Sequence, residues 1–270
     1  MTADFSGYIL PRGRTLAVVD NLIYDELGKE ALEKLNSKFK GTQLAYSPNE
    51  MPQEGQPLRF SNIRSLFLEQ AVGELTNNKI TLLSPEQILA NWNNIPERDE
   101  TYADSSLAIY PNEGPNETHR KRALGIINIS NPAAPIIVSG LTIAIADNED
   151  VFTLEPTNHT AYKEAPWLEK TQMITYNPKT GEIEPSEDGI MVQVPNDQSG
   201  LRRLFRVRDG LDARYVRLLN ADEDGRVQVI QDPKDHQKNL ELILKREASE
   251  MQARLMGALE YLKTGSIPNK

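Results

Sequence analysis

Two loops carry paired glutamates in nearly the same sequence context. Residues 44–54 read LAYSPNEMPQE and residues 107–117 read LAIYPNEGPNE, so seven of eleven aligned positions are identical at an offset of 63. If the loops converge across a pseudo-twofold axis, their carboxylates could hold a hard cation such as Mg²⁺ or Ca²⁺, or divide the acid and base roles of a reaction. These carboxylates are Glu50, Glu54, Glu113 and Glu117. The prolines and asparagines around them are equally typical of turns that need no chemistry.

A run of arginines stands out in an otherwise acidic chain. Six arginines fall within residues 202–217, and a strand there would place Arg202, Arg206 and Arg208 on one face. Guanidinium groups make bidentate contacts with phosphate and carboxylate. This face, extended by Arg214, therefore predicts a site for an anionic small molecule or partner. Internal pairing with the abundant Asp and Glu is the alternative, and the scarcity of interleaved aromatics disfavours nucleic acid.

Residues 220–225 read NADEDG and match the first half of a calcium-binding loop. Asp222 and Asp224 would be ligands, but the first position holds Asn220 and the twelfth holds Gln231 instead of a bidentate Glu. Because the flanking runs are typical of strands, the sequence favours a hairpin turn over a weak cation site.

Histidine offers one further candidate for acid–base chemistry. His159 stands beside Glu155 and Tyr162, and it joins Glu113 and Glu117 as a candidate catalytic residue. No pair of histidines has the spacing of a zinc site. The sequence also has no nucleophile elbow, phosphate-binding P-loop or dinucleotide-binding glycine motif, so no cofactor is evident apart from the Mg²⁺ or Ca²⁺ considered above.

The composition excludes several classes of protein. The chain has 270 residues, a formal net charge of −9 and no cysteine, which rules out disulfide scaffolds, iron–sulfur clusters and thiol nucleophiles. The acidic balance disfavours a general binder of phosphate backbones. No secretory signal is recognisable, and the longest apolar run, Pro135–Ala146, is too short to cross a bilayer. We therefore expect a cytoplasmic protein that does not enter a membrane.

The secondary structure that the sequence predicts around these residues changes along the chain. Short apolar runs alternate with helical patterns up to about residue 130, and strands dominate from Pro135 onward. Ser84, Pro85 and Gln87 have the pattern of a capped helix start. Apolar residues recur every three or four positions from Leu240 to Leu262, which predicts a long terminal helix.

These patterns predict a mixed α/β chain of the α+β class. The 63-residue offset of the loops indicates a βαβ-type duplication within an N-terminal α/β lobe, with chance similarity between two turns as the alternative. The predicted parts are an α/β lobe over 1–130 with repeats at about 14–76 and 77–130, a β-rich lobe over 131–232, and a C-terminal helix within 233–270.

Three hypotheses of function follow, and they leave open whether the protein is an enzyme. The first is a binding or assembly protein that recognises an anionic ligand or protein partner through the arginine face and self-associates through the terminal helix. The second is a metal-dependent hydrolase of anionic, phosphorylated substrates, in which arginines hold the anion and carboxylates or a bound cation activate water. The third is a structural component of a larger particle.

Overall fold

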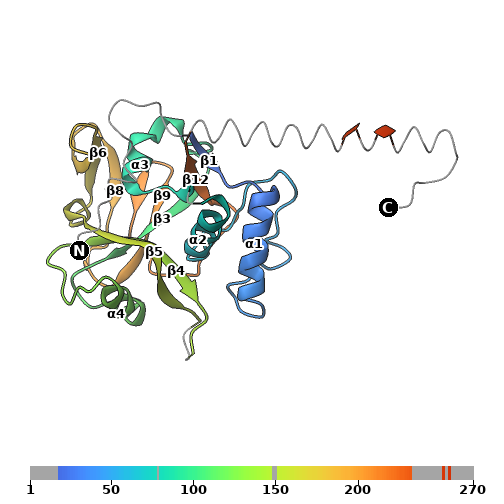
Figure 1. The fold of residues 1–270 in the computed structure, drawn as a ribbon. Coiled ribbons are helices and arrows are strands. Elements are labelled where there is room, and N and C mark those ends of the chain that lie inside the picture. The colour runs from blue at the N-terminus through green and yellow to red at the C-terminus, as the bar shows by residue number, and fades with distance from the viewer. Residues whose placement is uncertain (1–17, 78, 148–150, 233–250, 253–254, 257–270) are drawn as a thin grey trace.

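Two β-sheets organise the chain in the computed structural model, which describes residues 18–77, 79–147, 151–232, 251–252 and 255–256 (Figure 1). The larger sheet has nine strands in the order β5-β4-β3-β9-β10-β8-β6-β7, with β11 beside β3. These strands are β5 (Thr153–Glu164), β4 (Ile136–Ala144), β3 (Tyr102–Ile109), β9 (Leu201–Val207), β10 (Gly210–Asp212), β8 (Ile190–Gln193), β6 (Gln172–Asn177), β7 (Glu182–Pro185) and β11 (Gly225–Arg226). Most neighbours are antiparallel, while β8 and β10 run parallel, as do β3 and β11.

The smaller sheet joins three strands from distant parts of the chain. Its order is β1 (Val18–Asn21), β12 (Gln228–Gln231) and β2 (Ile80–Leu82), and β12 is antiparallel to both neighbours. The helices are α1 (Glu26–Lys38), α2 (Arg64–Thr76), α3 (Pro85–Ala90) and α4 (Glu117–Ile126). Helices α1 and α2 lie side by side, and α2 also contacts β2 and β4 (Figure 1).

Alternating side chains of the large sheet build a hydrophobic core on each of its faces. On β3, Leu107 and Ile109 belong to the core that α1, α2 and α4 cover. Ala108 and Tyr110 point the other way, into a core that contains Trp167 and residues of β6, β8 and β10. This period of two is the property of a strand buried on both faces.

The structure confirms the mixed α+β class, while the division of the chain into lobes stays a prediction. Strand β3, which precedes residue 131, pairs with β4 and β9, which follow it, so the expected boundary does not separate the sheets. The duplication is not confirmed: residues 44–54 form a loop, whereas residues 107–109 are the end of β3. The predicted C-terminal helix within 233–270 lies outside the described residues, except for 251–252 and 255–256, which are helical.

Helix α3 begins as its sequence predicts. The Ser84 hydroxyl accepts a hydrogen bond from the Gln87 backbone, and the Gln87 side chain accepts one from the Ser84 backbone. Over the part of the chain that the structure describes, no helix combines the length and the apolar character needed to cross a membrane.

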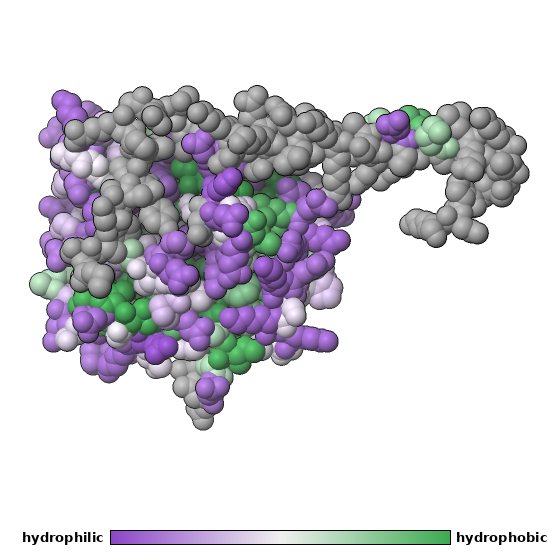
Figure 2. Space-filling view, viewed as in Figure 1, coloured by the Kyte–Doolittle hydropathy of each residue, from purple (hydrophilic) through white to green (hydrophobic). Residues whose placement is uncertain are grey.

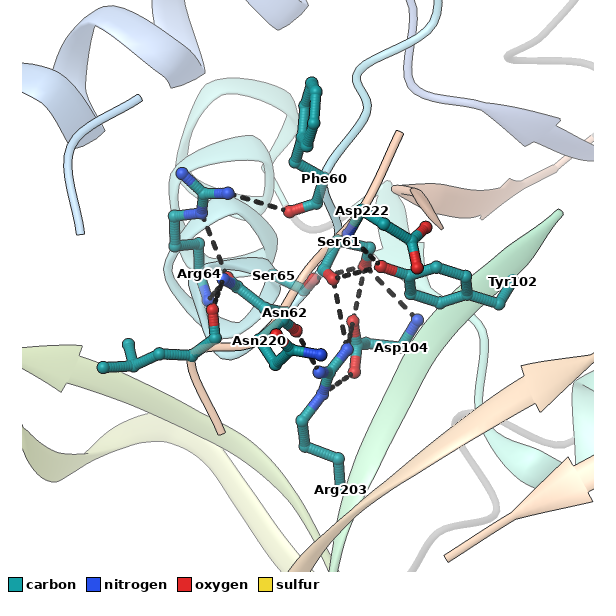
Figure 3. A network of polar contacts seen from close by, with 11 residues as sticks. Phe60, Ser61, Asn62, Arg64, Ser65, Tyr102, Asp104, Arg203, Asn220 and Asp222 are labelled. Atoms are coloured by element: carbon teal, nitrogen blue, oxygen red, sulfur yellow. Dashed lines mark hydrogen bonds and ion pairs between the residues drawn. The ribbon is translucent and has the colours of Figure 1, made fainter. Parts of the chain in front are cut away.

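A buried polar network fixes the start of α2 against the large sheet (Figure 3). The Asp104 carboxylate on β3 accepts hydrogen bonds from Arg203 Nε at 2.6 Å and from Arg203 Nη2 at 2.7 Å. The Ser61 hydroxyl donates to the same carboxylate at 2.6 Å and lies 2.8 Å from the Ser65 hydroxyl on α2. All four residues are buried or nearly so, and the network therefore ties β3, β9 and α2 together.

The remaining members of the network satisfy backbone groups near the same helix end. Asn62 Oδ1 accepts from the Arg64 backbone N–H at 2.9 Å, which caps the first turn of α2 in place of Ile63. Arg203 also donates to the carbonyl oxygens of Asn220 and Ser61. Burial by itself would lower the pKa of Arg203, but the Asp104 carboxylate raises it overall.

Replacing Asp104 with Asn should destabilise the protein by about 3–5 kcal/mol, because Arg203 would then be a buried charge without a counterion. The matched control is Asp99→Asn, which breaks the solvent-exposed pair between Asp99 and Arg98 and should change stability little. The free energy of unfolding in urea measures both. Equal losses for the two variants would show that the buried pair does not stabilise the fold.

Candidate functional site

A cavity of about 320 Å³ opens where α2 lies over β2 and the paired strands β4 and β5. Helix α2 contributes Glu69, Gln70 and Glu74 to its wall, and β2 contributes Thr81. Strand β5 contributes residues 156–159. We call this cavity the α2–bulge pocket, after the irregular part of β5 described next. Its volume is within the range of small-molecule sites, at the lower end.

An insertion in β5 shapes one wall of the pocket. Residues 157–160 loop out of the ladder opposite a single residue, Gly140. The pairs that bracket this bulge are Ser139 with Ala161 and Leu141 with Pro156. Bulges of this kind re-aim side chains and occur frequently next to functional sites. Here the bulge carries Asn158 and His159 to the pocket.

Gly140 is the residue that permits this bulge. Its φ is +65°, and a Cβ added there would lie 2.3 Å from the carbonyl oxygen of His159. The Gly140 carbonyl accepts hydrogen bonds from the hydroxyls of Thr157 at 2.6 Å and Thr160 at 2.7 Å. The looped-out residues are therefore held by specific contacts, and any side chain at position 140 would push them away.

Glu69 is the group in the pocket whose acid–base properties the fold changes most. Burial raises its pKa to about 7, and the opposing influence is a hydrogen bond from the backbone of Leu82. A carboxyl with this pKa exists in both protonation states at neutral pH. It can therefore donate a hydrogen bond, accept one, or exchange a proton with a bound molecule.

Gln70 and Glu74 form a second polar group on the same wall. Gln70 Nε2 donates to Glu74 Oε1 at 3.0 Å, and Lys34 on α1 lies 3.7 Å from Glu74 Oε2. Gln70 Oε1 is buried, and no donor among the described residues reaches it. Buried polar atoms in native structures usually have partners, so an unpaired acceptor at a pocket wall is notable.

The two ends of α2 explain why Glu69 is held in this place. The buried network around Asp104 fixes the start of the helix, and Asn77 in a left-handed conformation, with φ +53°, ends it. Between these points Leu68, Ala71 and Val72 pack into the hydrophobic core. Glu69 follows Leu68 on this fixed helix and is half-buried at the wall of the cavity.

The glutamates of the two loops have different partners, although Glu113 and Glu117 of the second loop share Lys121. Glu50 accepts from Arg64 at 2.9 Å, and Glu117 accepts from Arg120 at 3.1 Å. Glu113 lies 3.4 Å from Lys121, and Glu54 is exposed. Within the described residues, no three His, Asp or Glu side chains come together as a metal site would require. The Mg²⁺ or Ca²⁺ hypothesis stays a prediction.

The arginine run does not form one solvent-facing surface. Strand β9 lies between β3 and β10, which buries Arg202 and Arg206, while Arg208 and Arg214 are exposed. Arg202 Nη2 contacts both Asp197 oxygens at 2.8 and 2.9 Å, and Arg214 pairs with Asp212 at 2.7 Å. Internal pairing, the alternative interpretation of the sequence, therefore describes the geometry of Arg202 and Arg214.

Arg206 has neutral partners. It donates to Gln228 Oε1, the Thr101 hydroxyl and the Arg98 carbonyl at 2.8–3.1 Å. Burial lowers its pKa to about 10. The side chain therefore connects β9 to the segment before β3 and to β12.

The calcium-like segment is a turn. The Asp222 carboxylate accepts from the Asp224 backbone at 3.1 Å, and the Asp222 carbonyl accepts from Gly225 at 3.2 Å. Both aspartates are exposed, and the turn leads into β11. These contacts account for the Asp and Gly types at this position without a cation.

Of the sequence candidates, His159 is the one that lies at the pocket. Glu69 was not among them, although a carboxylate inside the mostly apolar run Ser65–Gly73 was an available signal. The environment of Glu69 depends on β2 and on the bulge of β5, and both are distant from Glu69 in sequence. Comparison of the chain with protein-family models, curated proteins and solved structures finds no match. The functional argument therefore depends on this geometry.

The raised pKa of Glu69 predicts a pH-dependent effect of Glu69→Gln. The folded-state pKa of about 7 lies above the ordinary value of 4.5, so the folded protein binds the proton more tightly than the unfolded chain. Wild-type stability should therefore fall by about 2–3 kcal/mol, relative to the variant, as the pH rises from 5 to 8.

Urea unfolding of both proteins at pH 5 and pH 8 measures this difference. Glu30→Gln, at an exposed position on α1, is the matched control and should leave the wild-type profile unchanged. A parallel pH profile for wild type and Glu69→Gln would contradict the raised pKa of the Glu69 carboxyl.

Proposed function

We propose that the protein binds a small polar molecule in the α2–bulge pocket. The observation that carries this proposal is the bulge of β5 over Gly140, which brings Asn158 and His159 to the cavity where Glu69 is held. A sheet gains no stability from looping out four residues, and the contacts that hold the loop are specific. Selection for a binding wall explains this cost better than folding does.

The proposal keeps the binding protein that the sequence predicts, but it moves the site from the arginine face to the α2–bulge pocket. Because Arg202 and Arg206 use their donors on the protein's own acceptors, they favour a structural role over an anion site. Glu69 would also suit acid–base chemistry on a bound molecule. The hydrolase hypothesis and the cytoplasmic location stay predictions from the sequence.

Filling the pocket mouth should abolish this binding. Asn158→Trp places a large side chain on the bulge, and Asn196→Trp makes the same change at an exposed position outside the pocket. Saturation-transfer NMR with a mixture of simple amines, carboxylates, sugars and nucleosides would identify molecules that bind the wild type. We expect at least one class to bind wild type and Asn196→Trp but not Asn158→Trp; identical spectra for all three would refute the site.

A second candidate function, self-association, is supported by exposed apolar residues near the C-terminal end. Met251, Leu255 and Met256 are 64%, 59% and 61% exposed. Figure 2 shows hydrophilic and hydrophobic residues side by side on the described part of the main body. Large apolar side chains gathered within six residues are typical of a surface that another chain covers. We propose a second copy of this chain as that partner.

Truncation after Asp232 should reduce the molar mass in solution to that of one chain. The double variant Met251→Lys, Leu255→Glu should have the same effect, because charges oppose burial of these positions in an interface. Light scattering coupled to size exclusion measures the mass of each. If the full-length chain and both variants have the same mass, self-association through these residues is excluded.

A further inference from the structure

The α2–bulge pocket is lined by two acidic side chains and by no basic Lys or Arg side chain among the described residues. Glu69 and Glu74 are carboxylic acids, and none of the described lining residues is Lys or Arg. Lys34 reaches Glu74 from α1 at 3.7 Å and is not part of the wall. The pocket therefore favours a positively charged ligand over an anion.

The two carboxyl groups differ in how far the protein already satisfies them. Glu74 accepts from Gln70 and pairs with Lys34. Glu69 has a backbone hydrogen bond from Leu82, while a carboxylate has about four acceptor positions. Glu69 is therefore the group with capacity left for a ligand, and its position beside the cavity makes that capacity accessible.

The cation that fits these acceptors is compact. An ammonium group carries three donors on a point charge and can use acceptors that lie in different directions, whereas the planar fork of a guanidinium group fits acceptors that lie in one plane. The acceptors of this pocket lie on separate walls: the Glu69 carboxylate and the unpaired Gln70 Oε1 belong to α2, Thr81 belongs to β2, and Asn158 belongs to β5. A cavity of about 320 Å³ also leaves room for a short alkyl chain behind the charged group.

We propose that the ligand of the α2–bulge pocket is a small primary alkylammonium, whose charge pairs with the Glu69 carboxylate. The step is balanced: a neutral Glu69 carboxyl and an ammonium ion give a carboxylate–ammonium pair and one proton released to solvent. The inference depends on the proposed binding function and adds the charge and chemical class of the ligand.

Other titratable and charged groups near Glu69 must be considered in any pH dependence. They are Glu74 on the same helix, Lys34 paired with it from α1, and His159 on the bulge of β5, while β2 contributes the Leu82 backbone. Histidine side chains titrate near neutral pH. A variant at His159 is therefore needed to separate its effect from that of Glu69.

Calorimetry with n-butylammonium and 1,4-diaminobutane on the full chain tests the proposal. Titration at pH 7 in two buffers of different ionisation enthalpy should show release of about half a proton per site, because the free Glu69 carboxyl is about half protonated there. The dissociation constant should be about fivefold higher at pH 6 than at pH 7.

Three variants show which residue releases the proton when the amine binds. Glu69→Gln should lose the proton release and the pH dependence and should weaken amine binding at least tenfold, whereas the exposed Glu30→Gln should match the wild type. His159→Gln should keep the release. Proton release that survives in Glu69→Gln would overturn the proposal.

The outcomes also separate this inference from the proposed function. If the amines fail to bind while a neutral or anionic probe binds and is blocked by Asn158→Trp, the pocket is a binding site but its ligand is not an ammonium. If no probe is sensitive to Asn158→Trp, both the binding function and the ligand class are refuted.

Discussion

The ion pair between Asp104 and Arg203 is the constraint on which the rest of the structure depends. It joins neighbouring strands β3 and β9 in the middle of the large sheet, with both side chains on the face that α2 covers. Taking these charges out of water costs several kcal/mol each, and this cost is offset only when both are paired and hydrogen-bonded. Ser61 and the carbonyl of Asn220 complete that requirement, so the pair admits one position for the start of α2.

Fixing α2 in this way has a consequence five residues further along the helix. Because Leu68 and Val72 pack in the hydrophobic core, they hold the orientation of α2, and the half-buried Glu69 stays at the wall of the pocket. The bulge of β5 opposite Gly140 forms the wall of the pocket that faces α2. The pocket therefore depends on the Asp104–Arg203 network at the start of α2 and on the bulge opposite Gly140 in the sheet. Glu69 lies between them, and its environment is set by both.

The sequence predicts the local parts of this arrangement and misses the parts that depend on neighbours. The capping box of Ser84 and Gln87 is encoded within four residues and is confirmed. The alternation of arginines along β9 is also encoded locally, but whether a strand is central or at an edge is set by pairing with β3 and β10, so burial of Arg202 and Arg206 could not be predicted. His159 could be selected as a candidate from its neighbours in sequence, whereas Glu69 becomes unusual only through packing against β2 and β5.

Internal arginine pairing also changes the meaning of the net charge of −9. Buried arginines such as Arg202 and Arg203 use their charges on the protein's own Asp197 and Asp104, and Arg206 uses its donors on neutral groups. These cations contribute little to binding of a ligand from solution, since they are neither accessible nor free to reorient. An acidic exterior raises the local concentration of cations around the molecule. The negative net charge, which disfavours binding of a phosphate backbone, therefore favours cations, as do the carboxyl groups of the α2–bulge pocket.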